Sequence, residues 1–137
     1  MMTNISEHIS YFEATQSNTA TRKGIDNTPF NETVLERMRT VANECFEPAR
    51  AHFGPIRINS FYRCVDLNKA VGGSITSSHV RGEAIDMTLG SKERNKELYE
   101  WCKANLIFDQ LINEYNYSWV HISFRVGENR NMAFSVG

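Results

Sequence analysis

The stretch SSHVRGEAIDM, residues 77–87, decides our interpretation of the fold because a histidine and an aspartate stand on either side of its glycine. Read as a loop that turns at the glycine into a short strand, it sends Asp86 to one strand face and Ile85 and Met87 to the other. The apolar face can enter a core, while the loop folds His79 back over the polar face. His79 and Asp86 are both metal ligands by residue type.

A second short stretch, WVHISF at residues 119–124, supplies a further ligand. Apolar and polar residues alternate along it, so His121 points away from the face that enters the core. Two histidines and one carboxylate, with a fourth position left for water, form a hydrolytic zinc site. The sequence therefore predicts a zinc hydrolase whose ligands are His79, Asp86 and His121.

A polar turn joins two predicted strands, residues 110–115 and 119–124. A two-residue loop and a four-residue loop give the same register, in which Glu114 shares a face with His121. Diagonal neighbours on one face lie roughly 7–8 Å apart, within reach of a glutamate side chain for a water held by the metal. We therefore predict Glu114 as the general base. Glu83 is the alternative base if its strand contains a bulge.

The bulk composition agrees with a small enzyme. The chain has 137 residues, and we expect one domain in which residues 1–29 form an arm or loop and residues 30–137 form the core. A net charge of −1 and a pI near 6.4 give no electrostatic case for nucleic acid or an anionic membrane as a partner. No apolar run approaches the length of a membrane-spanning helix. We expect a monomer.

The cysteines and the amino-terminal residues indicate the cellular compartment in which the protein is made. Cys45, Cys64 and Cys102 show no C-x-x-C spacing, and their odd number argues against a secreted disulfide scaffold, so we interpret them as reduced thiols. Residues 1–10 lack the basic end and the apolar run of a signal peptide. We therefore expect synthesis in the cytoplasm without a standard export signal.

Apolar spacing predicts a long amphipathic helix that begins after Asn31 and ends before Gly54-Pro55. The other expected elements are a brief helix or arm at 5–14, a polar loop at 15–29, a strand at 56–61, a short helix at 66–71, a helix capped by Ser91 that closes near 105, and strands at 110–115, 119–124 and 132–136. This order predicts an α+β fold with helices packed on a mostly antiparallel sheet.

Several motifs together resemble a known family. They are YFEATQS at 11–17, GIDNTP at 24–29, SFYR at 60–63, LNKAVGGS at 67–74, the histidine-to-aspartate stretch at 78–86, and WVHIS at 119–123. They resemble the zinc-dependent D-Ala-D-Ala carboxypeptidase and L-Ala-D-Glu endopeptidase family of bacterial cell-wall enzymes and phage endolysins. The small single-domain branch is the most similar. The resemblance implies the metal-site fold that this family shares with the hedgehog signalling domain.

The resemblance also implies roles for individual residues. The arginine of the family's Ser-Gly-Tyr-Arg motif falls on Arg63, which is implied to hold a substrate carboxylate or to stabilise a developing oxyanion. A pairing with Asp66 or another surface acid is the alternative for this arginine. Ser78 matches a residue that contacts substrate or braces the site. The residues implied to hold one zinc ion are His79, Asp86 and His121.

Two departures from the family pattern concern the pocket and the base. Phe61 stands where many relatives have glycine, and we expect it to alter the pocket wall next to Arg63. Several members have their catalytic glutamate three residues before the last histidine, where this chain has Ser118. The assignment of Glu114 therefore rests on the predicted hairpin. Trp119 is a further candidate for substrate contact. We interpret it as a packing lid over His121, and the alternative is a stacking platform for sugar.

The expected function is that of a zinc metallopeptidase that hydrolyses a bond of the peptidoglycan stem peptide, either D-Ala-D-Ala or L-Ala-D-Glu. An enzyme without an export signal would reach the wall as a phage endolysin released at lysis, which we favour, as a tail-associated lysin, or by an unrecognised export route. The alternative from another class is a non-catalytic zinc or peptidoglycan-binding module of the same fold. A structural protein of a phage particle is the third reading.

Overall fold

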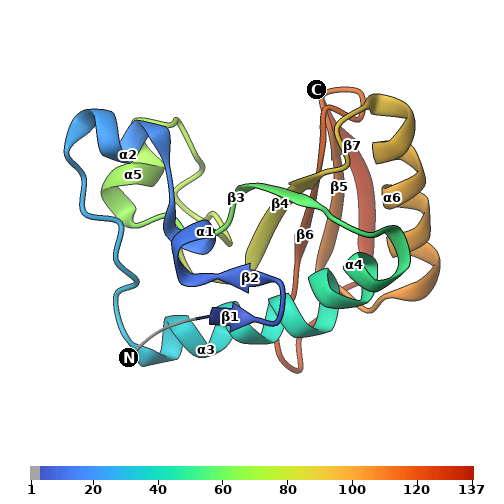
Figure 1. The fold of residues 1–137 in the computed structure, drawn as a ribbon, viewed down its shortest axis with the longest axis horizontal. Helices are drawn as coiled ribbons and strands as arrows, with labels where there is room; N and C mark the ends of the chain where they lie inside the picture. The colour runs from blue at the N-terminus through green and yellow to red at the C-terminus, as the bar shows by residue number, and fades with distance from the viewer. Residues whose placement is uncertain (1–3) are drawn as a thin grey trace.

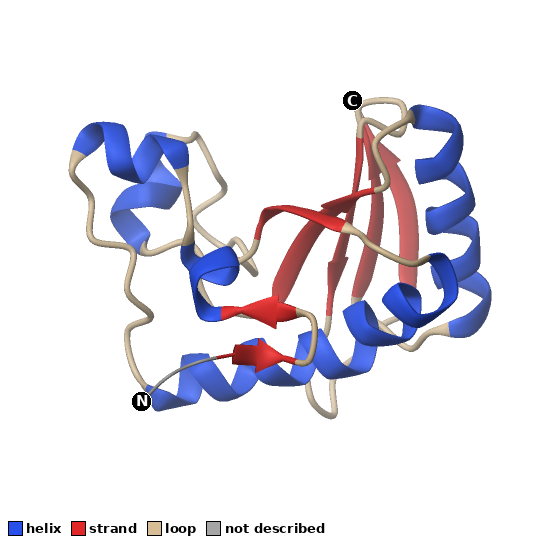
Figure 2. Ribbon diagram, in the orientation of Figure 1, coloured by secondary structure: helices blue, strands red, loops and turns tan. Residues whose placement is uncertain are grey.

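The structure is a computed structural model that describes residues 4–137, so residues 1–3 of the expected amino-terminal arm lie outside the described part. Its centre is a five-stranded sheet in the order β3-β4-β6-β5-β7 (Figures 1 and 2). The strands are β3 (Arg57–Ser60), β4 (Ala84–Thr88), β5 (Gln110–Glu114), β6 (Trp119–Ser123) and β7 (Met132–Val136). Neighbours pair antiparallel except β5 and β7, which are parallel. The predicted α+β class and mostly antiparallel sheet are confirmed.

The hydrophobic core lies between one face of this sheet and a helical layer. Ile85 and Val120 from the sheet are fully buried there together with Met38 and Leu98 from the helices. The helical layer consists of α3 (Glu32–Val41), the π-helix η1 (Ala42–Phe46), α4 (Glu47–Phe53) and α6 (Lys92–Asn105). In Figure 1, α6 stands against the sheet and α3, η1 and α4 run beneath it as one continuous rod. Because strand side chains alternate, the other sheet face is left to Asp86 and His121.

The long predicted helix is present, but it contains a π-helical turn that the apolar spacing did not indicate. Asn31 caps its start by accepting a hydrogen bond from the amide of Val34 at 3.0 Å, as predicted. Pro48 is the second residue after η1. Proline has no amide hydrogen to donate to the carbonyl four residues earlier, and this missing donor accounts for the change of helical pitch before it.

The amino-terminal segment is more ordered than predicted. It forms β1 (Asn4–Ser6), β2 (Ile9–Ser10), α1 (Tyr11–Thr15) and α2 (Asn18–Lys23), and α2 contacts α5 (Val65–Ala70). The prediction of a loop over residues 15–29 is wrong where α2 forms. Ser17 caps that helix, Gly24 ends it with a φ of 67°, and Ala20 is buried. In Figure 1, α1, α2 and α5 gather on the side of the sheet away from α6.

The β5–β6 hairpin confirms the predicted register, with Glu114 opposite Trp119 and Ile112 opposite His121. Its loop is four residues long, and three of them have positive φ angles of 52°, 56° and 61°. Asn95 of α6 stabilises this left-handed turn by donating to the carbonyls of residues 117 and 118 at 3.0 and 3.2 Å. The turn length therefore sets which face Glu114 occupies.

Two further predictions concern the described residues as a whole. Cys45, Cys64 and Cys102 are free thiols. Among residues 4–137, no helix combines the length and the apolar character needed to cross a membrane.

Candidate metal centre and substrate hollow

Two of the three predicted ligands come from directly paired strands. Asp86 of β4 lies opposite His121 of β6 in the antiparallel register, so their side chains project from the same sheet face. His121 Nδ1 lies 2.9 Å from Asp86 Oδ1. The period of two in each strand thus brings together two ligands that are far apart in sequence.

The third ligand, His79, comes from the loop before β4. Its Nδ1 lies 2.7 Å from the carbonyl oxygen of Phe61, and its own carbonyl accepts a hydrogen bond from the amide of Arg63 at 3.3 Å. Gly82 lets this loop turn, because its φ is 77° and a Cβ there would lie 2.8 Å from the carbonyl oxygen of Val34. The segment after β3 therefore fixes the ring of His79 over the sheet.

The electrostatics of this cluster favour a cation. The Phe61 carbonyl can only accept, so His79 Nδ1 carries a hydrogen and the Nε2 of the neutral ring has a bare lone pair. That Nε2 is buried, has no hydrogen-bond partner among the described residues, and faces Asp86 Oδ2 at 3.2 Å. Burial alone would raise the pKa of Asp86, but the positive charge and hydrogen bonds that protonated imidazoles supply beside it hold that pKa well below its usual range, so a cation at this position stabilises the carboxylate. A buried carboxylate and a bare imidazole nitrogen form a pair of acceptors.

A zinc-sized ion fits this donor set. The ligand atoms of His79, Asp86 and His121 all lie within 4.8 Å of one another, and the side chains are nearly buried, with residue exposures of 2 %, 5 % and 8 %. Two ligand atoms that each lie about 2 Å from a tetrahedral zinc ion are roughly 3.3 Å from each other. The distance from His121 Nδ1 to Asp86 Oδ1, 2.9 Å, and that from His79 Nε2 to Asp86 Oδ2, 3.2 Å, are close to this value. The backbone carbonyl on His79 Nδ1 is the outer partner typical of a metal-bound histidine.

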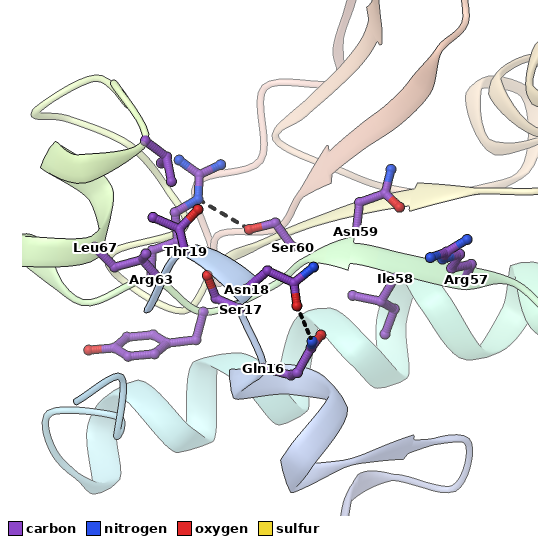
Figure 3. Close-up of a pocket in the computed structure, with 12 residues that line it drawn as sticks. Gln16, Ser17, Asn18, Thr19, Arg57, Ile58, Asn59, Ser60, Arg63 and Leu67 are labelled. Atoms are coloured by element: carbon purple, nitrogen blue, oxygen red, sulfur yellow. Dashed lines mark hydrogen bonds between the residues drawn. The ribbon is translucent and has the colours of Figure 1, made fainter. Parts of the chain in front are cut away.

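Arg63 is held beside this cluster by several contacts. Its Nε donates to Ser60 Oγ at 3.1 Å (Figure 3), its Nη1 donates to Asn68 Oδ1 at 3.0 Å, and its Nη2 lies 3.6 Å from Asp86 Oδ2. Burial lowers the pKa of Arg63, and the carboxylates of Asp86 and Glu114 oppose that shift. The alternative pairing with Asp66 is not formed. The Arg63 guanidinium is therefore a fixed cation at the rim of the cluster.

The cluster opens into a hollow of about 380 Å³. One wall is the loop that follows α5 and leads to His79, and the other wall is formed by β5 and β6. The residues that line it are Arg63, Gly73, Ser74, Thr76, Ser77, Ser78, His79, Gln110, Ile112, Glu114 and His121. The cation Arg63, the carboxylate of Glu114 and two of the predicted ligands, His79 and His121, thus line one polar space.

Glu114 lies in this hollow, as the hairpin register predicted. Burial raises its pKa, and the negative charge of Asp86 raises it further. Ser78 also lines the hollow, and its hydroxyl accepts from Arg81 Nη2 at 3.4 Å. Ser118 lies instead in the hairpin turn, where its hydroxyl donates to the carbonyl of Tyr115 at 2.7 Å. Glu114 is therefore the glutamate that the described fold brings to the cluster.

Trp119 lies opposite Glu114 in the hairpin register, and its ring packs against Tyr115 with centroids 5.3 Å apart. Its contact with substrate stays a prediction. One expectation requires correction. Phe61 does not alter the pocket wall, because its side chain is 1 % exposed and belongs to the hydrophobic core. Only its backbone carbonyl contacts the site. Glu83 also lies outside the hollow, with a carboxylate 2.6 Å from Arg81 Nε.

Sequence reasoning missed the residues that support Arg63. Asn68 is buried in α5, accepts from Arg63 and donates to the carbonyl of Ser74 at 2.8 Å. Gly73 packs so closely that a Cβ on it would lie 2.1 Å from Asn68 Oδ1 and 2.7 Å from Arg63 Nη1. The LNKAVGGS motif of the family resemblance contains both Asn68 and Gly73, but no local pattern assigns either of them a role.

The other histidines of the chain have structural partners elsewhere. His8 Nδ1 lies 2.7 Å from Glu47 Oε1, and the ring of His52 stacks on Trp101 with centroids 4.9 Å apart. Neither lines the hollow.

A family model described as Peptidase M15 matches residues 7–123, a span that includes each of the predicted ligands, Arg63 and Glu114. No curated protein matches the chain.

Proposed function

The chain belongs to the peptidase M15 family, and from that premise we propose that it is a zinc-dependent peptidase acting on the stem peptide of peptidoglycan. The single observation that carries the proposal is the buried pair of acceptors, His79 Nε2 and Asp86 Oδ2, with His121 beside them. The family match supports peptide hydrolysis, and the donor set supports zinc as the cofactor.

In this proposal His79, Asp86 and His121 hold the zinc ion. When bound there, zinc supplies the Lewis acidity that lowers the pKa of a water and polarises a peptide carbonyl. The hydrogen bond from His79 Nδ1 to the Phe61 carbonyl keeps the lone pair of Nε2 directed at the site.

The proposed general base is Glu114, which lines the hollow next to His121. Its carboxylate takes a proton from the attacking water and returns a proton to the amine that leaves. Its partial burial raises its pKa, which makes it a better proton acceptor than a solvated glutamate. The shape and polarity of the hollow suit a polar peptide.

Arg63 is proposed to bind a substrate carboxylate or the developing oxyanion. Its Nε and Nη1 are occupied by Ser60 and Asn68, so the guanidinium plane is fixed before substrate arrives. A planar guanidinium pairs with carboxylates through parallel hydrogen bonds, and both candidate bonds of the stem peptide have a carboxylate nearby.

The test is incubation of the zinc-loaded protein with purified peptidoglycan and soluble stem peptides, followed by mass spectrometry of the products. Loss of one alanine identifies a carboxypeptidase, and release of the stem from its first alanine identifies an endopeptidase. No cleavage across several wall types, with zinc bound in stoichiometric amount, would overturn the proposal in favour of a binding module.

The role of Glu114 is tested with Glu114→Gln, which keeps the side-chain shape and removes the basic carboxylate. We expect kcat to fall by about 10²–10⁴-fold while zinc binding is retained. Glu97→Gln is the matched control, because Glu97 is an exposed residue of α6 that does not line the hollow. Unchanged kcat in Glu114→Gln would refute the assignment of the base.

A further inference from the structure

Arg63 also lines a second hollow of about 390 Å³ (Figure 3). This hollow is bounded by the turn between α1 and α2, by β3 and by α5. Arg63 lines both this hollow and the hollow described above, which is lined by the predicted metal ligands His79 and His121. The two spaces are therefore neighbours that share one arginine.

The charges that line this second hollow have one sign. Among its lining residues, all within the described part of the chain, Arg57 and Arg63 are the charged ones and none is acidic. This contrasts with the net charge of −1 of the whole chain. A concave surface with cationic walls concentrates anions.

The two arginines differ in what already occupies them. Arg63 Nη2 lies 3.6 Å from Oδ2 of Asp86, one of the predicted metal ligands. Arg57, at the opposite end of the hollow in Figure 3, is exposed and has no ion-pair partner among the described residues. Arg57 therefore remains free to bind an anion.

The wall also contains uncharged side chains that can form hydrogen bonds. Gln16 Nε2 donates to Asn18 Oδ1 at 3.2 Å, which orients the Asn18 amide with its NH₂ group still available as a donor. Asn59 also lines the hollow, and Figure 3 shows its side chain between Ser60 and Arg57. Amide donors flanking a free guanidinium form a surface suited to a carboxylate and its neighbouring peptide groups.

We propose that this hollow is a second carboxylate-binding subsite, in which Arg57 selects peptides that have an additional free carboxylate beyond the one bound by Arg63. The inference rests on the proposed function, because it takes the substrate to be a peptide that extends from the metal cluster past Arg63. A stem peptide contains several carboxylates, so one peptide can occupy both hollows at once. Arg57 is then a specificity residue that contacts substrate away from the bond that is cut.

The experiment uses a set of synthetic stem peptides in which each free carboxylate other than the carboxyl terminus is replaced in turn by a carboxamide. Values of kcat/KM are measured for the wild-type chain, for Arg57→Gln and for Arg50→Gln. Arg50 is a half-buried residue of α4 that lines neither hollow, so it controls for the loss of one arginine elsewhere in the chain.

For the wild type we expect one amidation to lower kcat/KM by about ten-fold, the loss of one charge-assisted hydrogen bond. Arg57→Gln should lower kcat/KM on the free acid by the same factor and should no longer respond to that amidation. Arg50→Gln should behave as the wild type. The subsite would be overturned if no amidation changed kcat/KM of the wild type. It would also be overturned if Arg57→Gln lowered kcat/KM equally on the free acid and on its amide.

Measurements of peptide binding test the subsite independently of whether the protein cleaves peptides. Titration calorimetry with zinc-loaded Glu114→Gln should give a Kd about ten-fold lower for the free acid than for its amide, and the added Arg57→Gln change should remove that difference. If no peptide is cleaved but this difference in Kd is present, the peptidase proposal fails and the subsite stands. Equal Kd values for acid and amide would reject the subsite even in an active peptidase.

Discussion

Replacing Gly73 by alanine tests whether the support behind Arg63 matters for function. The added Cβ would lie 2.1 Å from Asn68 Oδ1 and 2.7 Å from Arg63 Nη1, whereas unbonded heavy atoms normally approach to roughly 3.5 Å. The Asn68 side chain must therefore move by more than about 1 Å, or the loop that contains Gly73 must move away from α5. Either movement breaks the 3.0 Å hydrogen bond that fixes the guanidinium.

The magnitude follows from the bonds that are lost. A hydrogen bond to a charged group contributes about 1.5–3 kcal/mol and a neutral one about 1 kcal/mol, so losing the Asn68 contacts to Arg63 and to the Ser74 carbonyl costs about 3 kcal/mol. If Arg63 stabilises charge in the transition state, we expect kcat/KM on a stem peptide to fall about 100-fold. The metal ligands lie on other segments, so stoichiometric zinc binding should persist.

The measurement pairs steady-state kinetics with zinc analysis and thermal unfolding of the same preparation. Gly72→Asn is the matched control, because a Cβ at Gly72 meets no atom within 4 Å and asparagine tolerates its φ of 75°. A folded, zinc-loaded Gly73→Ala protein with wild-type kcat/KM would refute the reasoning that Asn68 must hold Arg63 in place.

Three further predictions concern stability and reactivity. Asn27→Ala should lower the free energy of unfolding by about 3 kcal/mol in denaturant titrations, because the buried amide donates to two backbone carbonyls and accepts from one backbone amide, in bonds of 2.7–3.0 Å. The hydrogen bonds from Arg130 lower the pKa of Asp109 in the folded protein. The stabilisation that ionised Asp109 gives the fold should therefore be complete above the pKa of about 3.9 that aspartate has in the unfolded chain, and it should be lost as pH falls through the lower pKa of the folded state. Asp109→Asn should therefore be less stable than wild type by about 1 kcal/mol at pH 7, a difference that should shrink below about pH 4. Burial raises the pKa of Cys102 to about 12, so a thiol reagent at pH 8 should modify only the half-buried Cys64 in the native protein, as counted by intact mass.

The parts of the fold that the sequence predicted are those governed by short-range periodicity. Alternation in β4 and β6 was enough to place Asp86 and His121 on one polar face, and a polar turn of even length was enough to place Glu114 beside them. The long helix and α6 were marked by Asn31 and Ser91 as caps. Each of these signals depends on neighbours within a few residues.

The parts that were missed depend on contacts between distant segments. Helix α2 lies in a polar run without apolar periodicity, and it is stabilised by its caps and by packing against α5. The side chain of Phe61 turns into the core, which no local pattern reveals. Gly73 is required by the close approach of Asn68 and Arg63, a packing relation that only the folded chain makes visible.

The four-residue hairpin turn has a consequence for how such a domain can change its function during evolution. Gain or loss of a single residue in this turn would redirect Glu114 to the opposite side of the sheet and leave His79, Asp86 and His121 untouched. A metal-binding protein without hydrolytic activity is thus one small insertion or deletion away from the peptidase proposed above. Descendants of one ancestral gene could separate into enzymes and binding proteins through the length of a turn, with no substitution at any metal ligand.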